Sequence, residues 1–151
     1  MSSQRVTELL RKAYSDEMET VMNYTTNSIV LDGVRAEEIK ESLQADIQEE
    51  LNHAQRLGRR LKVLDEKPPG SAEFTASQHS LQPPEDTTDV LSVIEGVLDA
   101  ENDAIETYRE LIDAAEAADD PVTEDLAVEI LGDEESHRME FRGFRKEYRQ
   151  D

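Results

Sequence analysis

Apolar side chains recur every three or four residues along four long stretches of this chain, with polar side chains between them. A pattern with this period places the apolar positions on one face of an α-helix. The sequence therefore predicts an all-α protein with four long helices, which we place at about 3–30, 36–64, 88–117 and 120–148.

Residues typical of helix ends support these limits. Gly33 follows the first helix, and glycine tolerates the left-handed conformation that closes a helix. The third helix is expected to begin near Thr87 or Thr88. Asp120-Pro121 begins the fourth, because an aspartate N-cap followed by a proline suits the first turn of a helix.

The lengths of the connections predict how the helices are joined. The links between the first and second helices, and between the third and fourth, are only a few residues long, so each pair forms an antiparallel hairpin. The segment at about 65–87 holds four of the five prolines, and we expect a long irregular crossover there. The result is a single domain over residues 1–151, a four-helix bundle made of two antiparallel hairpins joined by a crossover.

The chain is strongly acidic, with 36 Asp and Glu against 16 Lys and Arg and a formal net charge of −20. Phosphate-rich partners need clustered cations, so we expect neither nucleic acid nor an anionic membrane as a partner. Because a Debye length of ~3 Å at 1 M salt screens most of the self-repulsion, the charge indicates a salt-rich cytoplasm.

The absence of cysteine excludes disulfides, thiolate catalysis and metal sites built on cysteine. Apolar runs stay well short of the ~18 residues that a membrane span needs. The N-terminal sequence also lacks the apolar core of a signal peptide. We therefore expect a cytoplasmic protein.

Two Glu-x-x-His motifs occur in the chain, one in the second predicted helix and one in the fourth. Each follows, at a separation of 33 residues, a Glu of the preceding helix, and each of these Glu residues has a tyrosine seven positions later. Helical bundles build di-metal sites from such a set, with a Glu from each of two helices and a Glu-x-x-His from each of the others. The duplicated residues are Glu17 with Tyr24, Glu50 with His53, Glu101 with Tyr108, and Glu134 with His137.

The four glutamates lie on the apolar faces of their predicted helices. Ile47 lies three residues before Glu50, for example, and Ile130 lies four residues before Glu134. A buried unpaired carboxylate costs several kcal/mol or stays protonated. Two divalent cations neutralise four carboxylates, so the pattern predicts a pair of metal ions inside the bundle.

Neighbouring positions on one helix allow each Glu-x-x-His motif to bind one metal ion, because residues i and i+3 lie on the same face. We assign Glu17 and Glu101 as terminal ligands, and Glu50 and Glu134 as bridging ligands. Carboxylate and imidazole ligands suit iron, manganese or zinc. We expect two Fe ions, because carboxylate bridges accommodate both oxidation states.

Other residues near these positions have simpler interpretations. Tyr24 and Tyr108 are core aromatics, or in the functional interpretation hydroxyls that orient a ligand carboxylate. His79 is expected to be solvated in the crossover, and close helix approach is the plain explanation of Gly96 and Gly132. The chain has 22 Glu, so a single Glu-x-x-His is a weak signal, and a metal-free helical interaction module is an alternative.

Four segments match the pattern of a known family, namely Glu17 with Tyr24, Glu50-Leu-Asn-His53, Glu101, and Asp-Glu134-Glu-Ser-His137. Over nearly the whole chain the arrangement resembles the ferritin-like di-iron carboxylate superfamily, and within it the ferroxidase centre of bacterioferritins. The resemblance implies oxidation of Fe(II) by O2 or H2O2, iron storage or detoxification, and protection against oxidative stress.

Departures from the family pattern refine this expectation. Bacterioferritins bind haem through a Met that is Leu51 here, so we expect no haem. Only 14 residues follow His137, which leaves no room for the fifth helix of bacterioferritins, and a Dps-like dodecamer or a dimer is expected. Rubrerythrins have a further Glu where this chain has Ala104, yet a non-storing di-iron or di-manganese peroxidase or oxidase remains an alternative.

Overall fold

A computed structural model describes residues 2–149 of the chain. It contains four long α-helices and one short 3-10 helix, and the prediction of an all-α four-helix bundle is confirmed. Within this described part no helix is both long and apolar enough to cross a membrane. The elements in chain order are α1 (Ser2–Val30), η1 (Val34–Ala36), α2 (Glu37–Val63), α3 (Val90–Ala117) and α4 (Pro121–Tyr148).

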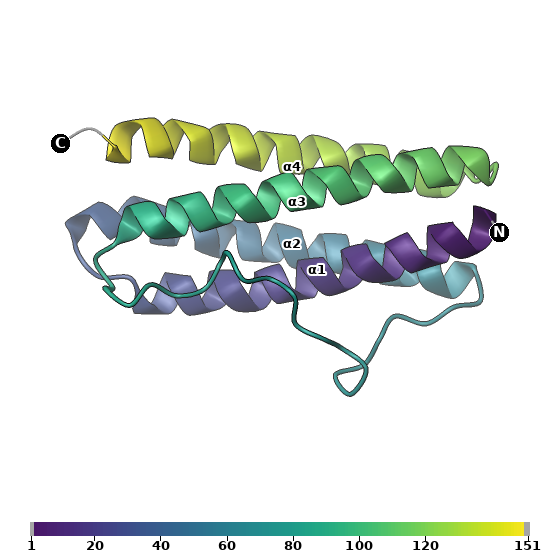
Figure 1. Ribbon diagram of the computed structural model, residues 1–151, viewed down its shortest axis with the longest axis horizontal. Coiled ribbons are helices and arrows are strands. Elements are labelled where there is room, and N and C mark those ends of the chain that lie inside the picture. Colours follow the sequence, from purple (N-terminus) through teal and green to yellow (C-terminus); the bar gives the residue numbers. More distant parts are fainter. Residues whose placement is uncertain (1, 150–151) are drawn as a thin grey trace.

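The helices form two antiparallel hairpins that pack side by side. α1 packs against α2 and α3, and α3 packs against α4. Figure 1 shows that the chain leaves the end of α2, returns along α1 and enters α3, so that α2 and α3 run in the same direction. This long crossover gives the bundle its up-down-down-up order.

The start of α4 agrees with the predicted cap, whereas α3 begins later than predicted. The Asp120 side chain accepts a hydrogen bond from the Thr123 backbone N–H, and Pro121 occupies the first turn of α4. α3 begins at Val90, and its N-cap is Asp89. The Asp89 side chain accepts a hydrogen bond from the backbone N–H of Ser92. The expected start near residues 87–88 is therefore wrong.

The two threonines before α3 are held in the crossover by other contacts. Thr87 donates its hydroxyl to Asp32 at 2.7 Å, and the Asp32 backbone N–H donates to the Thr87 carbonyl at 2.9 Å. Thr88 donates both its hydroxyl and its backbone N–H to Asp86. These bonds tie the end of the crossover to the turn after α1, where Gly33 has a positive φ of 102°.

The apolar core consists of two clusters, and each contains one of the two tyrosines noted in the sequence. One cluster contains Tyr24 and Leu81 of the crossover. The other contains Tyr108 and the apolar residues of the first turns of α1. On α1, Glu17 lies between Ala13 of one cluster and Tyr24 of the other, so the predicted metal-binding residues occupy the polar layer between two apolar ones.

The two helix glycines singled out in the sequence have different surroundings. A Cβ on Gly96 would lie 2.5 Å from the Ser80 carbonyl oxygen, so the close neighbour is the backbone of the crossover and not another helix. A Cβ on Gly132 would meet nothing within 4 Å among the described residues. The expectation of close helix approach is therefore wrong at both positions.

Candidate metal centre

All six predicted ligand side chains are buried and meet at one level of the bundle. The exposed fraction is 2% for Glu17 and Glu101, and 1% for Glu50 and Glu134. α1 and α3 each supply one Glu, and α2 and α4 each supply a Glu and a His. The helical repeat explains this convergence, because every one of these residues lies on the apolar stripe of its helix.

The six residues form two overlapping groups of four. In each group, one oxygen or nitrogen atom from every residue lies within 4.8 Å of the corresponding atoms of the others. Glu50 and Glu134 belong to both groups, the position expected of bridging ligands, whereas Glu17 and Glu101 each belong to one. The first group is Glu17, Glu50, His53 and Glu134, and the second is Glu50, Glu101, Glu134 and His137.

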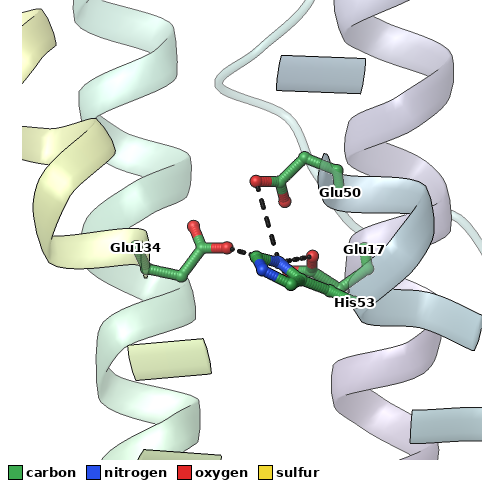
Figure 2. A group of neighbouring side chains, drawn as sticks. All are labelled: Glu17, Glu50, His53 and Glu134. Carbon is green, nitrogen blue, oxygen red and sulfur yellow. Dashed lines mark hydrogen bonds and ion pairs between the residues drawn. The ribbon is translucent and has the colours of Figure 1, made fainter. Parts of the chain in front are cut away.

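His53 lies at the centre of the first group, with its Nδ1 atom directed at three carboxylates (Figure 2). The Nδ1 atom is 3.0 Å from Glu17 Oε2 and 3.1 Å from Glu134 Oε1. It is 3.9 Å from Glu50 Oε1. Figure 2 shows Glu134 reaching the imidazole from the opposite side of the bundle, so a cation placed here would join both hairpins.

His137 occupies the equivalent place in the second group. Its Nδ1 atom is 3.1 Å from Glu50 Oε1, 3.8 Å from Glu101 Oε1 and 3.9 Å from Glu134 Oε2. The same nitrogen of each imidazole therefore faces the shared carboxylates. This repeated geometry follows from the i, i+3 spacing of Glu and His on α2 and α4.

The outer nitrogen of each imidazole contacts a carboxylate that sequence reasoning did not assign to the site. His53 Nε2 lies 2.9 Å from Asp133 Oδ2, and His137 Nε2 lies 2.9 Å from Glu49 Oε2. Asp46 Oδ1 is a further 3.7 Å neighbour of His137. The sequence holds only a weak signal for them: an acidic residue directly precedes the Glu of both Glu-x-x-His motifs. Carboxylates in this place fix the orientation of a ligand imidazole.

Both tyrosines are fully buried beside the terminal glutamates. The Tyr24 hydroxyl donates a hydrogen bond to Glu101 Oε1 at 2.8 Å. Burial raises the pKa of Tyr108, and the nearby Glu17 charge raises it further. Burial and the Glu101 charge do the same to the pKa of Tyr24, so both hydroxyls keep their protons at neutral pH.

The carboxylates and imidazoles of the centre have strongly shifted proton affinities. Burial raises the pKa of Glu17, Glu50 and Glu101 well above the ordinary value. Burial also opposes the ionised form of Glu134, but hydrogen bonds from Glu101 and the two imidazoles outweigh it and lower the Glu134 pKa. Without a cation, therefore, the centre balances its charge by holding protons.

The imidazoles take part in the same balance. Burial alone would lower the pKa of His53, but the hydrogen bond to Glu134 and the other carboxylates raise it to about 9. For His137, hydrogen bonds to Glu134 and Glu50 likewise outweigh burial and raise the pKa. Carboxylate oxygens lie within 3.1 Å of both nitrogens of each ring, which favours the charged imidazolium form in the metal-free protein.

The residues present fit a pair of divalent cations. Among residues 2–149, four atoms of the six predicted ligand side chains are buried with no hydrogen-bond partner. Buried polar atoms are rarely left unpaired, and a metal ion supplies the missing interaction. These atoms are Glu50 Oε1, Glu101 Oε2, Glu134 Oε1 and His137 Nδ1.

Two residues noted in the sequence lie outside this centre. Glu135, which follows a predicted ligand, points to the surface and forms an ion pair with Arg109 at 3.3 Å. His79 is exposed in the crossover, as expected. Helical rotation accounts for Glu135, because adjacent positions on a helix point about 100° apart.

A four-helix bundle with a buried, duplicated Glu and Glu-x-x-His set has the arrangement from which helical bundles build di-metal sites. The chain is a member of the ferritin-like family: the ferritin-like domain matches residues 7–150. The family resemblance noted in the sequence is thereby confirmed, and it carries an iron-related function for this protein. No curated protein sequence matches the chain significantly.

Solved structures with the same fold come from several bacteria. A ferritin-like diiron-carboxylate protein from Bacillus anthracis str. Ames is 19% identical, with a TM-score of 0.85 over 96% of this chain and 98% of that chain. Desulfovibrio desulfuricans bacterioferritin is 22% identical, with a TM-score of 0.81 over 97% and 82% of the two chains. A dodecameric thioferritin from Bacteroides fragilis is 20% identical, with a TM-score of 0.83 over 99% and 89%.

Proposed function

We propose that this protein is a ferroxidase that oxidises Fe(II) with O2 or H2O2, and that it serves iron storage or detoxification and protection against oxidative stress. The observation that carries the proposal is the pair of overlapping groups that share Glu50 and Glu134. Two cations bound in these groups would have one terminal Glu, one imidazole nitrogen and two shared carboxylates each. We place this activity in a salt-rich cytoplasm because the composition is strongly acidic.

Charge balance supports two Fe(II) ions as the bound substrate. Four carboxylates carry four negative charges when ionised, and two Fe(II) ions carry four positive charges. Binding therefore replaces the protons that the buried carboxylates and imidazoles otherwise hold. Manganese or zinc suits the same ligands, so the metal that occupies the centre depends on which of them is available.

The protein's own groups hold and orient the substrate ions. Asp133 and Glu49 would fix the two imidazoles, each with Nδ1 toward the shared space. Tyr24 would hold the Glu101 carboxylate through its hydrogen bond. Ile130, fully buried one turn before Glu134, would keep bulk water out of the centre.

The chemistry supplied by bound iron is one-electron oxidation of each ion. Two Fe(II), one H2O2 and two protons give two Fe(III) and two water molecules. With O2 as the oxidant, the same two electrons and two protons give H2O2. The centre suits this stoichiometry because it brings two one-electron donors within reach of a single oxidant.

The same proposal includes assembly and the absence of haem. The thioferritin from Bacteroides fragilis is described as dodecameric and bacterioferritin-related. We propose a homo-oligomer for this chain also, a dodecamer if it stores iron and a dimer if it does not. We propose that no haem is bound, because Leu51 replaces the methionine on which haem binding in bacterioferritins depends.

Mixing the metal-free protein with two equivalents of Fe(II) under air tests the function directly. The parent should form Fe(III) rapidly, and Glu50→Ala or His137→Ala should slow the rate on the order of a hundredfold by removing a ligand. Glu135→Ala is the matched control, since Glu135 lies on the surface beside the centre. Oxidation by the ligand variants at the parental rate would contradict the proposal.

Iron retention separates storage from simple oxidation. After repeated additions of Fe(II), a storing assembly keeps an iron core that co-elutes with the protein during gel filtration. A non-storing di-iron or di-manganese peroxidase or oxidase keeps only the ions of its centres. A protein purified and reconstituted without any bound metal would support the metal-free interaction module instead.

A further inference from the structure

The two halves of the centre repeat with an offset of 84 residues in the sequence. Glu17 corresponds to Glu101, and Tyr24 corresponds to Tyr108. The α1–α2 hairpin and the α3–α4 hairpin therefore present equivalent sides to the metal ions. The crossover occurs only once in the chain and has no such counterpart, so it is the element that makes the two sides different.

Side chains of α1 fasten the crossover to one end of the groove between α1 and α3. Glu19 accepts hydrogen bonds from the backbone N–H groups of Ser77 at 2.9 Å and Gln78 at 2.6 Å. Gln78 Nε2 donates to Thr20 Oγ1 at 2.7 Å, and Asn23 Nδ2 donates to Gln78 Oε1 at 2.9 Å. These contacts fix the crossover against the part of α1 that leads to Tyr24.

The next residues of the crossover seal the groove on the Tyr24 side. Leu81 is fully buried in the same apolar cluster as Tyr24, and its carbonyl accepts a hydrogen bond from Asn27. The Ser80 carbonyl lies so close to Gly96 of α3 that a larger residue in place of Gly96 would collide with it. The crossover thus covers the end of the groove at which Tyr24 binds Glu101.

The other end of the same groove stays open. A cavity of about 550 Å³ lies between α1 and α3, bounded on one side by residues 77–80 of the crossover, and Glu17 is part of its wall. Glu101 is not among the residues that line this cavity. On α3 the wall includes Ala104, a small side chain one turn after Glu101, and Ala100, which directly precedes Glu101.

The charge of the cavity suits a divalent cation. Its lining includes Asp16, Asp103, Glu106 and Glu110, all on the outer part of α1 and α3. The opposing cation is Lys12, whose Nζ atom is 2.8 Å from Asp16 and 3.1 Å from the Thr107 hydroxyl. Acidic walls of this kind concentrate cations and speed their association.

We propose that divalent cations reach the centre through this cavity, and that the position formed by Glu17 and His53 fills before the position formed by Glu101 and His137. The inference rests on the proposed function to the extent that the six side chains must bind two cations. The crossover is the physical cause of the order, because it closes one of two otherwise equivalent ends. Ala104 is the residue that keeps the path open.

Stopped-flow binding of Co(II), whose visible absorption reports its ligands, tests the order with a symmetric pair of variants. The parent should bind two Co(II) per chain in a fast and a slow phase. Glu17→Ala should lose the fast phase, whereas Glu101→Ala should keep it and lose the slow one. Identical behaviour of the two variants, or loss of the fast phase in Glu101→Ala, would overturn the proposal.

A second pair of variants tests the path. Ala104→Leu should slow the fast phase about tenfold, equivalent to ~1.4 kcal/mol in the barrier, without changing the final two Co(II) per chain. Ala114→Leu is the control, because Ala114 is also half-buried on α3 but does not line the cavity. An unchanged fast phase in Ala104→Leu would show that cations enter elsewhere, for example beside Glu49 and Asp133.

Charge reversal gives an independent measurement if Ala104→Leu disturbs the fold. Asp103→Lys at the mouth of the cavity should slow the fast phase at low salt, and the effect should shrink as salt is added. Asp113→Lys, on an exposed part of α3 outside the cavity, should not slow it. Equal rates of the fast phase in Asp103→Lys and Asp113→Lys would contradict entry through this cavity. A parent that binds no pair of Co(II) ions would contradict the proposed function itself.

Discussion

Carboxylates inside a helical bundle are the residues on which this account depends. Removing a charged group from water costs several kcal/mol unless a partner or a proton compensates it. Glu17, Glu50 and Glu101 respond with pKa values raised by burial, and Glu134 is kept ionised by hydrogen bonds. The metal-free centre therefore holds protons, and we expect bound cations to displace them.

The proton affinity of these residues predicts the pH dependence of stability. His53 has a pKa of about 9 in the folded protein, against an ordinary value of 6.5, so its stabilising effect is full below pH 6.5 and lost toward pH 9. The raised carboxyl pKa values act in the same direction. The lowered pKa of Glu134 has the opposite sign, but it acts only below its ordinary value of 4.5.

We therefore expect the Tm of the metal-free protein to fall between pH 6.5 and pH 9, with a loss of a few kcal/mol in unfolding free energy. Two equivalents of Co(II) should remove this fall, because the cations replace the protons. Calorimetry of cation binding should also detect proton release. A Tm that rises over this pH range in the metal-free protein would contradict the assignment.

The outer carboxylates should tune the affinity for metal. Asp133→Asn or Glu49→Gln replaces the charged acceptor of an imidazole N–H by a neutral amide while leaving the shape of the side chain nearly unchanged. We expect the affinity for Co(II) to fall about 10- to 100-fold in titrations. Glu135→Gln is the control at the adjacent surface position, and an equal loss in this variant would point to general electrostatics instead.

The sequence predicts the six side chains that line the centre, but it does not predict the acidic residues that contact the outer imidazole nitrogens. The repeat of Glu and His at fixed spacing locates the six inner side chains, whose role as ligands stays a prediction. The role of Asp133, Glu49 and Asp46 depends on which imidazole nitrogen faces inward, which the spacing does not specify. Acids also crowd every helix of this chain, so a further acid on the helix carries little signal.

Among the elements, the crossover contributes most beyond the regular bundle. It has no regular secondary structure, yet Glu19 and Gln78 hold it to α1 through backbone and side-chain hydrogen bonds. Gly96 makes the contact with α3 possible. The element that separates the two hairpins in sequence thus also determines which end of the groove is closed.

Two glycine substitutions test this role with a matched pair. Gly96→Ala places a Cβ 2.5 Å from the Ser80 carbonyl, so the crossover must move, and we expect a lower Tm and faster proteolysis of residues 77–81. Gly132→Ala meets no atom within 4 Å and should stabilise α4 by about 1 kcal/mol through helix propensity. Thermal unfolding measures both, and stabilisation by Gly96→Ala would contradict the packing described.

Helices were predictable from the sequence, but the path of the crossover was not. Apolar periodicity and the Asp120-Pro121 cap indicate helices through local rules. Asp89 was missed as the N-cap because Thr87 and Thr88 are equally good candidates, and contacts with Asp32 and Asp86 decide against them. Such contacts join residues far apart in sequence or within an irregular turn, where no period exists to guide a prediction.

For the whole molecule, the net charge of −20 sets the conditions under which the fold is stable. Self-repulsion falls as salt shortens the Debye length from ~10 Å at 0.1 M to ~3 Å at 1 M. We expect Tm to rise with KCl, by about 2–4 °C for each kcal/mol recovered. A neutral solute at equal osmolality is the control, and a Tm that falls with KCl would contradict a salt-rich setting.

The architecture of the whole molecule was accessible from sequence because one pattern occurs twice. Duplicated spacing between Glu and Glu-x-x-His fixes which helices face one another, and short links fix the two hairpins. Assembly is a different matter, since exposed residues such as Met22 and Ile29 on α1 do not by themselves specify a partner. Subunit number therefore stays a prediction.

Anomalous scattering at the iron absorption edge, from crystals exposed to Fe(II) without oxygen, would locate the bound ions themselves. We expect two peaks per chain, both enclosed by the six inner side chains, with Glu50 and Glu134 contacting both ions. A single peak, no peak, or peaks confined to exposed acids on the helix surfaces would contradict this expectation.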